Sequence, residues 1–67
     1  MEIIRKENYI AVISNKKMDR NGNPKYNLNI FQENENGEYF ERAETKISSY
    51  NIKKDVEYIL EQYVLGV

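Results

Sequence analysis

Oxygen-bearing side chains alternate in the segment DRNGNP, where Asp19, Asn21 and Asn23 have the spacing of the first ligands in a calcium-binding loop. Such a loop needs Gly at its sixth position and a bidentate Glu at its twelfth, but the chain has Pro24 and Ile30 there. The same segment contains an Asn-Gly dipeptide, which closes tight β-hairpins because both residues tolerate a positive φ. We therefore predict a hairpin turn without bound metal, in which Asp19 accepts hydrogen bonds from turn amides.

A second pattern that could support chemistry is Glu44-Thr45-Lys46, which puts an acid and a base on one face of a strand. It resembles the Glu-x-Lys element of restriction-type nuclease cores, and that resemblance implies a magnesium ion held by carboxylates beside a lysine. The metal-binding Asp that such cores carry on a neighbouring strand is missing. We interpret the two side chains as alternating charges on a solvated strand face, opposite Asn27 and Asn29.

Composition excludes several classes of protein. The 67 residues include no Cys and no His, which removes disulfides, the usual zinc ligands, thiol nucleophiles and imidazole acid–base catalysis. We predict a single small domain over residues 1–67 that is not an enzyme and binds no cofactor or metal. No apolar stretch has the length of a membrane span and the start is not a secretory signal, so we expect a cytoplasmic protein with no membrane partner.

Secondary structure follows from two changes of pattern. Asn-Gly sites at residues 21–22 and 36–37 are flanked by alternating apolar residues, which predicts strands at about 9–17, 25–32 and 38–47. The period then changes to about 3.6, which predicts a helix at about 52–65 with Asn51 as its N-cap and Gly66 at its end. Its apolar stripe comprises Ile52, Val56, Ile59, Leu60 and Tyr63. The predicted fold class is α+β: a three-stranded antiparallel meander followed by a C-terminal helix packed on one face, βββα, with a fourth strand in MEIIRK left open.

The register of the second hairpin follows if Asn36-Gly37 is a two-residue turn. It pairs Tyr26 with Ile47, Leu28 with Thr45 and Ile30 with Ala43 on the helix side, and Asn27 with Lys46, Asn29 with Glu44 and Phe31 with Arg42 on the other. An even loop in the first hairpin would put Ile13 opposite Ile30 and Val12 opposite Phe31. A longer, bulged loop around Pro24 is the alternative, so the buried face of the first strand stays open.

This register predicts an apolar patch on the face away from the helix. It comprises Ile10, Val12, Phe31 and Phe40, with Arg42 at its edge. Because a helix on one face leaves the other uncovered, the N-terminal segment (Met1, Ile3 and Ile4), a second copy of the chain or a protein partner must hide this patch. Aromatic residues beside an Arg are typical of binding hot spots.

Two hypotheses for function remain. The first is a small protein-binding module; its composition is compatible with AT-rich codons, as in many phages and mobile elements, which suggests an inhibitor of a host or defence protein that acts by direct binding or self-associates as a homodimer. The second is a nucleic-acid-binding accessory domain, since the order of elements is similar to that of the arm-type DNA-binding domains of tyrosine recombinases. Its contacts would be Lys16, Lys17, Arg20 and Lys25 around the first turn. The net charge of −1 disfavours the second hypothesis.

Overall fold

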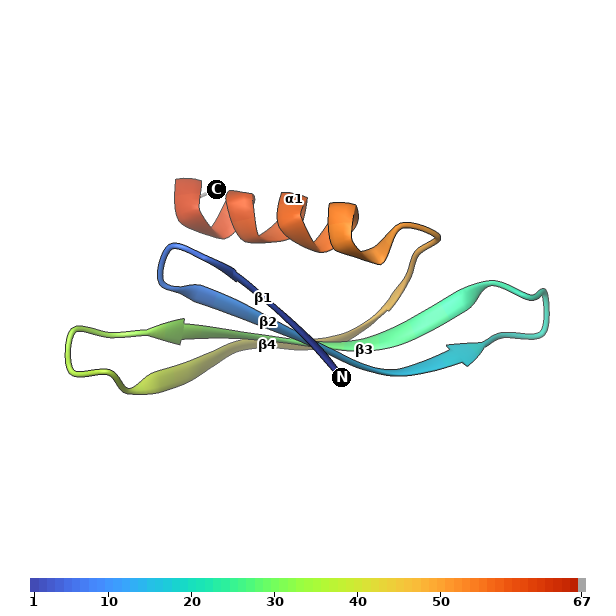
Figure 1. Cartoon of the computed structure of the whole chain (residues 1–67), viewed down its shortest axis with the longest axis horizontal. Helices are drawn as coiled ribbons and strands as arrows, with labels where there is room; N and C mark the ends of the chain where they lie inside the picture. The colour runs from blue at the N-terminus through green and yellow to red at the C-terminus, as the bar shows by residue number, and fades with distance from the viewer. Residues whose placement is uncertain (67) are drawn as a thin grey trace.

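The computed structural model describes residues 1–66, which form a four-stranded antiparallel sheet and one helix (Figure 1). The elements are β1 (Glu2–Lys6), β2 (Tyr9–Met18), β3 (Pro24–Glu33), β4 (Tyr39–Ser48) and α1 (Ile52–Leu65), and the strands pair in chain order. This arrangement confirms the α+β prediction of a meander followed by a helix, with the MEIIRK segment forming an additional edge strand. The bounds of β2, β3, β4 and α1 lie within one residue of the expected ranges.

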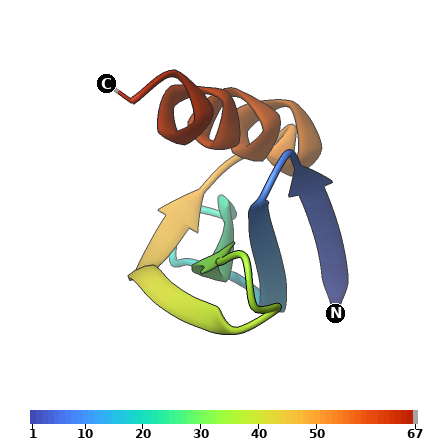
Figure 2. The same ribbon diagram turned by 90° about the vertical axis from the view of Figure 1, so that its left-hand side faces the viewer.

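The core lies between α1 and one face of the sheet, which we call the helix face (Figure 2). Its fully buried residues are Ala11, Ile13, Leu28, Ile30, Val56 and Leu60. The predicted helical stripe is confirmed, because its remaining members, Ile52, Ile59 and Tyr63, pack against this core. The first predicted strand therefore buries the face that carries Ala11 and Ile13, which answers the question that the sequence left open.

Both ends of α1 have the predicted caps. The Asn51 side chain accepts a hydrogen bond from the Lys54 amide at 3.4 Å, and Gly66 closes the helix in the left-handed conformation at a φ of 77°. The buried Ser49 hydroxyl donates to the Asp55 carboxylate at 2.5 Å and accepts from the Asn51 amide at 3.1 Å. This network fixes where the chain leaves β4 and enters the helix. Within residues 1–66 the structure contains no helix of the length and apolarity that a membrane crossing requires.

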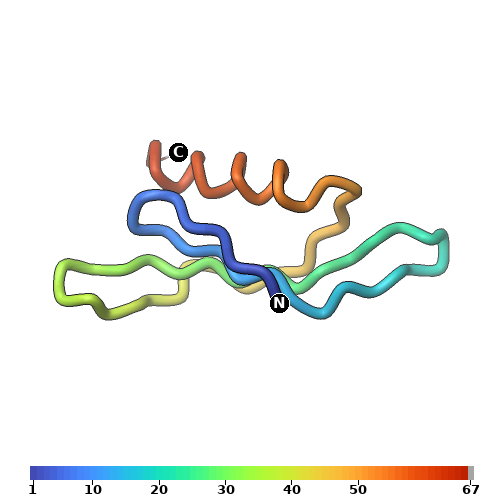
Figure 3. Tube along the Cα trace, viewed as in Figure 1, coloured from blue at the N-terminus to red at the C-terminus, as the bar shows by residue number. Residues whose placement is uncertain are grey.

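The β2–β3 and β3–β4 turns lie at opposite ends of the long axis of the molecule, which measures 43 Å (Figure 3). Each is a three-residue loop. The two-residue turn predicted at Asn36-Gly37 is therefore wrong, and the first hairpin has the longer, bulged loop that the sequence left open. The amides of Gly22 and Gly37 donate to the carbonyls of Asp19 and Asn34, three residues earlier, and both glycines have a left-handed φ, 80° and 79°. This is a type I turn followed by a glycine bulge, which needs a positive φ at one residue only.

The residue just before each loop holds the turn with its side chain. The Asp19 carboxylate accepts from the amides of Asn21 and Asn23 at 2.8 Å, as predicted for the first turn. In the second turn the Asn34 amide oxygen accepts from the amides of residues 36 and 38 at 2.9 Å. The two turns are thus built alike, one around a carboxylate and the other around an uncharged amide.

This likeness leads to a prediction for the variant Asp19→Asn. The backbone hydrogen bond from Asn23 lowers the pKa of the Asp19 carboxyl below its ordinary value of 3.8, although desolvation opposes the shift. A lowered folded-state pKa gives stability that is present above the unfolded value and is lost as the pH falls through the folded value. At pH 7 the variant should keep a melting temperature close to that of the wild type, because Asn34 already performs this task.

Between pH 4 and pH 2 the wild type should lose more stability than Asp19→Asn, since only the carboxylate can be protonated. Melting temperatures of both proteins across this range measure the difference. Parallel losses in the two proteins would show that protonation of Asp19 does not weaken the turn.

The register of β3 and β4 is partly as predicted. Ile30 pairs with Ala43, and the pairs from there toward Lys25 also match the prediction. The prediction that Phe31 lies opposite Arg42 is wrong, because a bulge in β4 puts Glu41 opposite Phe31 instead. The loop is one residue longer than expected and the bulge inserts one residue into β4, so the two differences cancel beyond the bulge.

The register of β2 and β3 that an even first loop would give is wrong by two residues. Ile13 pairs with Leu28 rather than Ile30, and Phe31 pairs with Ile10 rather than Val12. A bulge near Asn15, which has a positive φ of 53°, and the longer loop cause the shift. Because side chains alternate with a period of two, a two-residue shift keeps every residue on its expected face.

Candidate protein-binding face

The sheet face away from α1, which we call the outer face, carries apolar side chains that no element of residues 1–66 covers. Ile10 lies directly opposite Phe31, and Val12 lies opposite both Ile3 of β1 and Asn29 of β3. Directly opposed residues of antiparallel strands point to the same face. We call the four apolar residues Ile3, Ile10, Val12 and Phe31 the outer patch. Ile3 is 62% exposed and the other three are half-buried.

Three of the predicted partner-binding residues, Ile10, Val12 and Phe31, are therefore brought together on the outer face. Phe40 is not among them, because the β4 bulge pairs it with Gln32, whose side chain lies on the helix face. Ile3 takes its place in the patch. The alternation in EIIRK could have indicated this, but the sequence alone left this segment unassigned.

Arg42 also leaves the outer patch for the helix face. Its guanidinium donates to the Gln32 side chain and lies 5.9 Å from the ring centroid of Tyr63 in α1. The Tyr63 ring in turn packs against Tyr9 at a centroid distance of 5.4 Å. Arg42 thus caps the end of the core by hydrogen bonding and cation–π contact rather than bordering the patch.

The outer patch is flanked by acidic side chains toward the β3–β4 turn. Glu41 lies opposite Phe31, and Glu44 lies opposite Asn29. Glu33, two residues beyond Phe31, forms an ion pair with Arg5. Glu41 accepts a long hydrogen bond of 3.5 Å from the Asn29 side chain. We call Glu33 and Glu41 the acidic end of the outer face.

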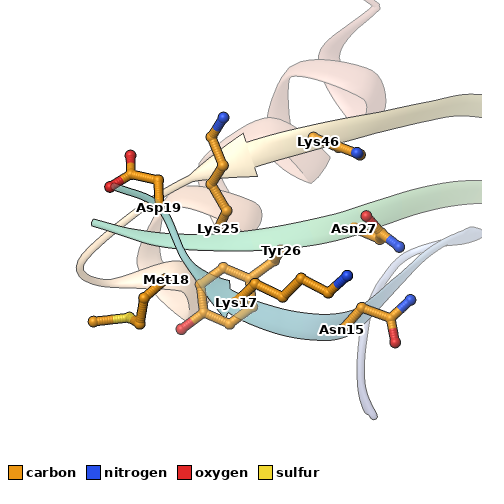
Figure 4. Close-up of a pocket in the computed structure, with 8 residues that line it drawn as sticks. All are labelled: Asn15, Lys17, Met18, Asp19, Lys25, Tyr26, Asn27 and Lys46. Atoms are coloured by element: carbon orange, nitrogen blue, oxygen red, sulfur yellow. The ribbon is translucent and has the colours of Figure 1, made fainter. Parts of the chain in front are cut away.

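The opposite end of the outer face is basic. Lys17 lies directly opposite Lys25, and Lys46 lies opposite Asn27, so three neighbouring strands each contribute a lysine. We call these three residues the basic end. They line a cavity of about 250 Å³ together with Asn15, Met18, Asp19, Tyr26 and Asn27. Figure 4 shows that the Lys25 side chain points away from those of Lys17 and Lys46, so the three amino groups do not converge on one point.

The predicted nucleic-acid contacts are only partly brought together. Lys17 and Lys25 share the basic end, whereas Lys16 lines a separate hollow beside Met1 and Ile52. Arg20 is exposed in the turn itself. Lys46 joins the basic end although it comes from β4, and only the strand register could have indicated this. None of the ion pairs within residues 1–66 involves a lysine of the basic end.

Other exposed apolar side chains lie elsewhere on the surface. Tyr58 and Leu65 on α1 are 64% and 65% exposed, and Tyr50 before the helix is 79% exposed. Residues 1–66 contain no group of three acidic side chains placed to hold a metal ion.

Comparison with protein-family models, curated proteins and solved structures gives no match to this chain.

Proposed function

We propose that this chain is a small, non-enzymatic protein-binding module that docks a protein against its outer patch. The observation that carries the proposal is the position of Ile3, Ile10, Val12 and Phe31 on a sheet face opposite the helix. Apolar side chains that gather on one exposed face favour a protein interface over isolated surface positions. Phe31 supplies the aromatic anchor that is typical of such interfaces.

The absence of His and Cys from the sequence supports the non-enzymatic part of the proposal, because the commonest acid–base and nucleophilic groups are missing. Composition is also the support for a narrower hypothesis. The chain has many Asn, Lys, Ile and Tyr residues, which are compatible with the AT-rich codons of many phages and mobile elements. We therefore keep the hypothesis that the bound protein is a host or defence protein that this chain inhibits.

Nucleic-acid binding is the competing function, and the basic end is the observation that favours it. Three lysines across neighbouring strands, none of which forms an ion pair within residues 1–66, are suited to phosphate contacts. Two facts oppose this function: the net charge is −1, and the same face carries Glu33, Glu41 and Glu44 further along the strands. Protein binding is therefore the better supported of the two.

The double variant Ile3→Ser with Phe31→Ser tests the proposal. Both side chains point away from the core, so the variant should stay folded but lose the protein that a tagged wild-type chain captures in its host, whether that is an untagged copy or another protein. Circular dichroism measures folding, and affinity purification with and without nuclease treatment measures capture. If the wild-type chain captured its partner without nuclease treatment but not after it, binding would be assigned to nucleic acid.

Phe40→Ser is the matched control, because Phe40 is 55% exposed but lies outside the outer patch. It should capture the same protein as the wild type. Capture that persists in the folded double variant, or that depends on Phe40 instead, would contradict docking at the outer patch.

A further inference from the structure

Two lysines and two glutamates of the outer face lie symmetrically about one row of residues. This row runs across the whole sheet through Ile3, Val12, Asn29 and Glu44, which are paired in that order. Along β3, Lys25 and Glu33 lie four residues to either side of Asn29. On β4, Lys46 lies opposite Asn27 and Glu41 lies opposite Phe31. Asn27 and Phe31 are each two residues from Asn29, so Lys46 and Glu41 lie at equal distances on either side of Glu44. Each of these lysines therefore has a glutamate on its own strand, at the same distance on the other side of the row. The counterpart of Lys25 is Glu33, and that of Lys46 is Glu41.

We propose that the protein docked on the outer patch is a second copy of this chain, related to the first by a twofold axis along this row. This inference rests on the proposed function, since it names the partner of the same patch. A rotation of 180° about this axis reverses the second copy along the direction of its strands, so that its acidic end covers the basic end of the first copy. Lys46 then faces Glu41 of the second copy, Lys25 faces Glu33, and each contact occurs twice.

The same axis brings two of the four apolar residues of the outer patch onto the same residues of the second copy, while Phe31 and Ile10 face Asn27 and Ser14. Val12 and Ile3 lie on the axis row, so each meets its own counterpart in the second copy. Glu44 also meets its counterpart, but β4 is an edge strand and Glu44 is exposed, so water and salt screen this repulsion. The alternative axis, parallel to the strands between β2 and β3, would set Lys17 against Lys25 twice and would gain only the contact of Glu41 with Arg5, so the charges favour the axis along the row.

The size of the face fits a small interface. One strand of five residues and three of ten, at roughly 16 Å² for each residue, give an outer face of about 550 Å². Specific interfaces usually bury about 600–1,000 Å² on each partner. The expected product is thus a dimer that dissociates on dilution, with a dissociation constant on the order of micromolar.

Charge exchange between Lys46 and Glu41 tests the geometry with purified chain alone. Lys46→Glu and Glu41→Lys should each weaken self-association by roughly tenfold, because every dimer then holds two repulsive contacts. An equimolar mixture of the two variants should regain association, since a mixed dimer replaces the two like-charged contacts of each homodimer with two attractive pairs. The chain that carries both changes should regain the wild-type association constant for the same reason.

Sedimentation equilibrium at several concentrations measures each association constant. Lys54→Glu is the matched control, because Lys54 is an exposed lysine on α1 away from the outer face, and it should leave association unchanged. Melting curves confirm that each exposed substitution leaves the fold intact. Loss of association without recovery in the mixture and in the doubly changed chain would overturn the proposed axis.

A wild-type mass of 8.0 kDa, the mass of one chain, at all concentrations would overturn the second copy as the partner. If capture of another protein still depended on Ile3 and Phe31, the proposed function would survive that result. If nothing were captured through the patch, both would fail. A monomer that binds a short oligonucleotide only while Lys46 is present would assign the basic end to nucleic acid and would also overturn the dimer.

Discussion

Leu60→Ala is expected to lower the free energy of unfolding by about 3 kcal/mol, the largest effect of any single substitution proposed here. Leu60 is fully buried between α1 and the sheet, so truncation removes apolar contacts and leaves a cavity. A chain of this size has roughly 3–10 kcal/mol of stability in total. The melting temperature should therefore fall by about 12–24 °C.

Leu65→Ala is the matched control for Leu60→Ala, because Leu65 lies in the same helix but is 65% exposed. Its effect should stay within about 0.5 kcal/mol. Thermal melting followed by circular dichroism compares the two variants. Similar losses at the two positions would contradict the packing of α1 on the sheet.

The second large effect is expected at the turn glycines. Gly22→Val and Gly37→Val should each cost about 1–2 kcal/mol, because both positions have a left-handed φ that a β-branched residue rarely adopts. Space is not the cause, since a Cβ at Gly22 would meet no atom within 4 Å and one at Gly37 would lie 3.9 Å from a Glu33 oxygen. The two losses should be similar, because both loops have the same geometry.

The matched control at each turn is Gly→Asn, since Asn adopts the left-handed conformation more readily than other non-glycine residues. Gly22→Asn and Gly37→Asn should therefore lose less stability than the corresponding Val variants in thermal melts. If the Val variants melted at the same temperatures as the Asn variants, the glycines would not be required for a positive φ.

Periodicity was sufficient to predict the meander, the helix and the faces of β3 and β4 that pack against it, but it left open the MEIIRK strand and the buried face of β2. Leu28 and Ile30 alternate with polar residues in β3, and Val56 and Leu60 recur at helical spacing, so both sets could be assigned to the core from local pattern alone. The middle of the β3–β4 register was also predicted correctly. That success depended on a loop one residue longer than expected and a one-residue bulge, whose effects cancel beyond Phe31.

The composition of the patch could not be predicted because the bulge has no local sequence signature. In YFERAE, nothing distinguishes a regular strand from one that places Arg42 and Ala43 on the same face. The contact that holds Arg42 there involves Tyr63, which is 21 residues away on another element. Tertiary packing therefore decided the positions of Phe40 and Arg42, and local alternation could not.

The separation of charge was hidden for a different reason. A net charge of −1 describes the sum over the chain and says nothing of how the charges are arranged. Lys46 and Glu41 are only five residues apart in the sequence, yet the register places them on opposite sides of the Asn29 row. The basic and acidic ends become visible only when the strands are paired.

The central claim, that a second copy docks on the outer patch, is tested most directly by an NMR dilution series of the labelled, purified chain. We predict that the amide resonances of Val12, Asn29 and Phe31 shift between micromolar and millimolar concentration, while those of Tyr58 and Leu65 on the exposed side of α1 do not. Spectra that stay unchanged over this range, or changes confined to α1, would contradict the claim.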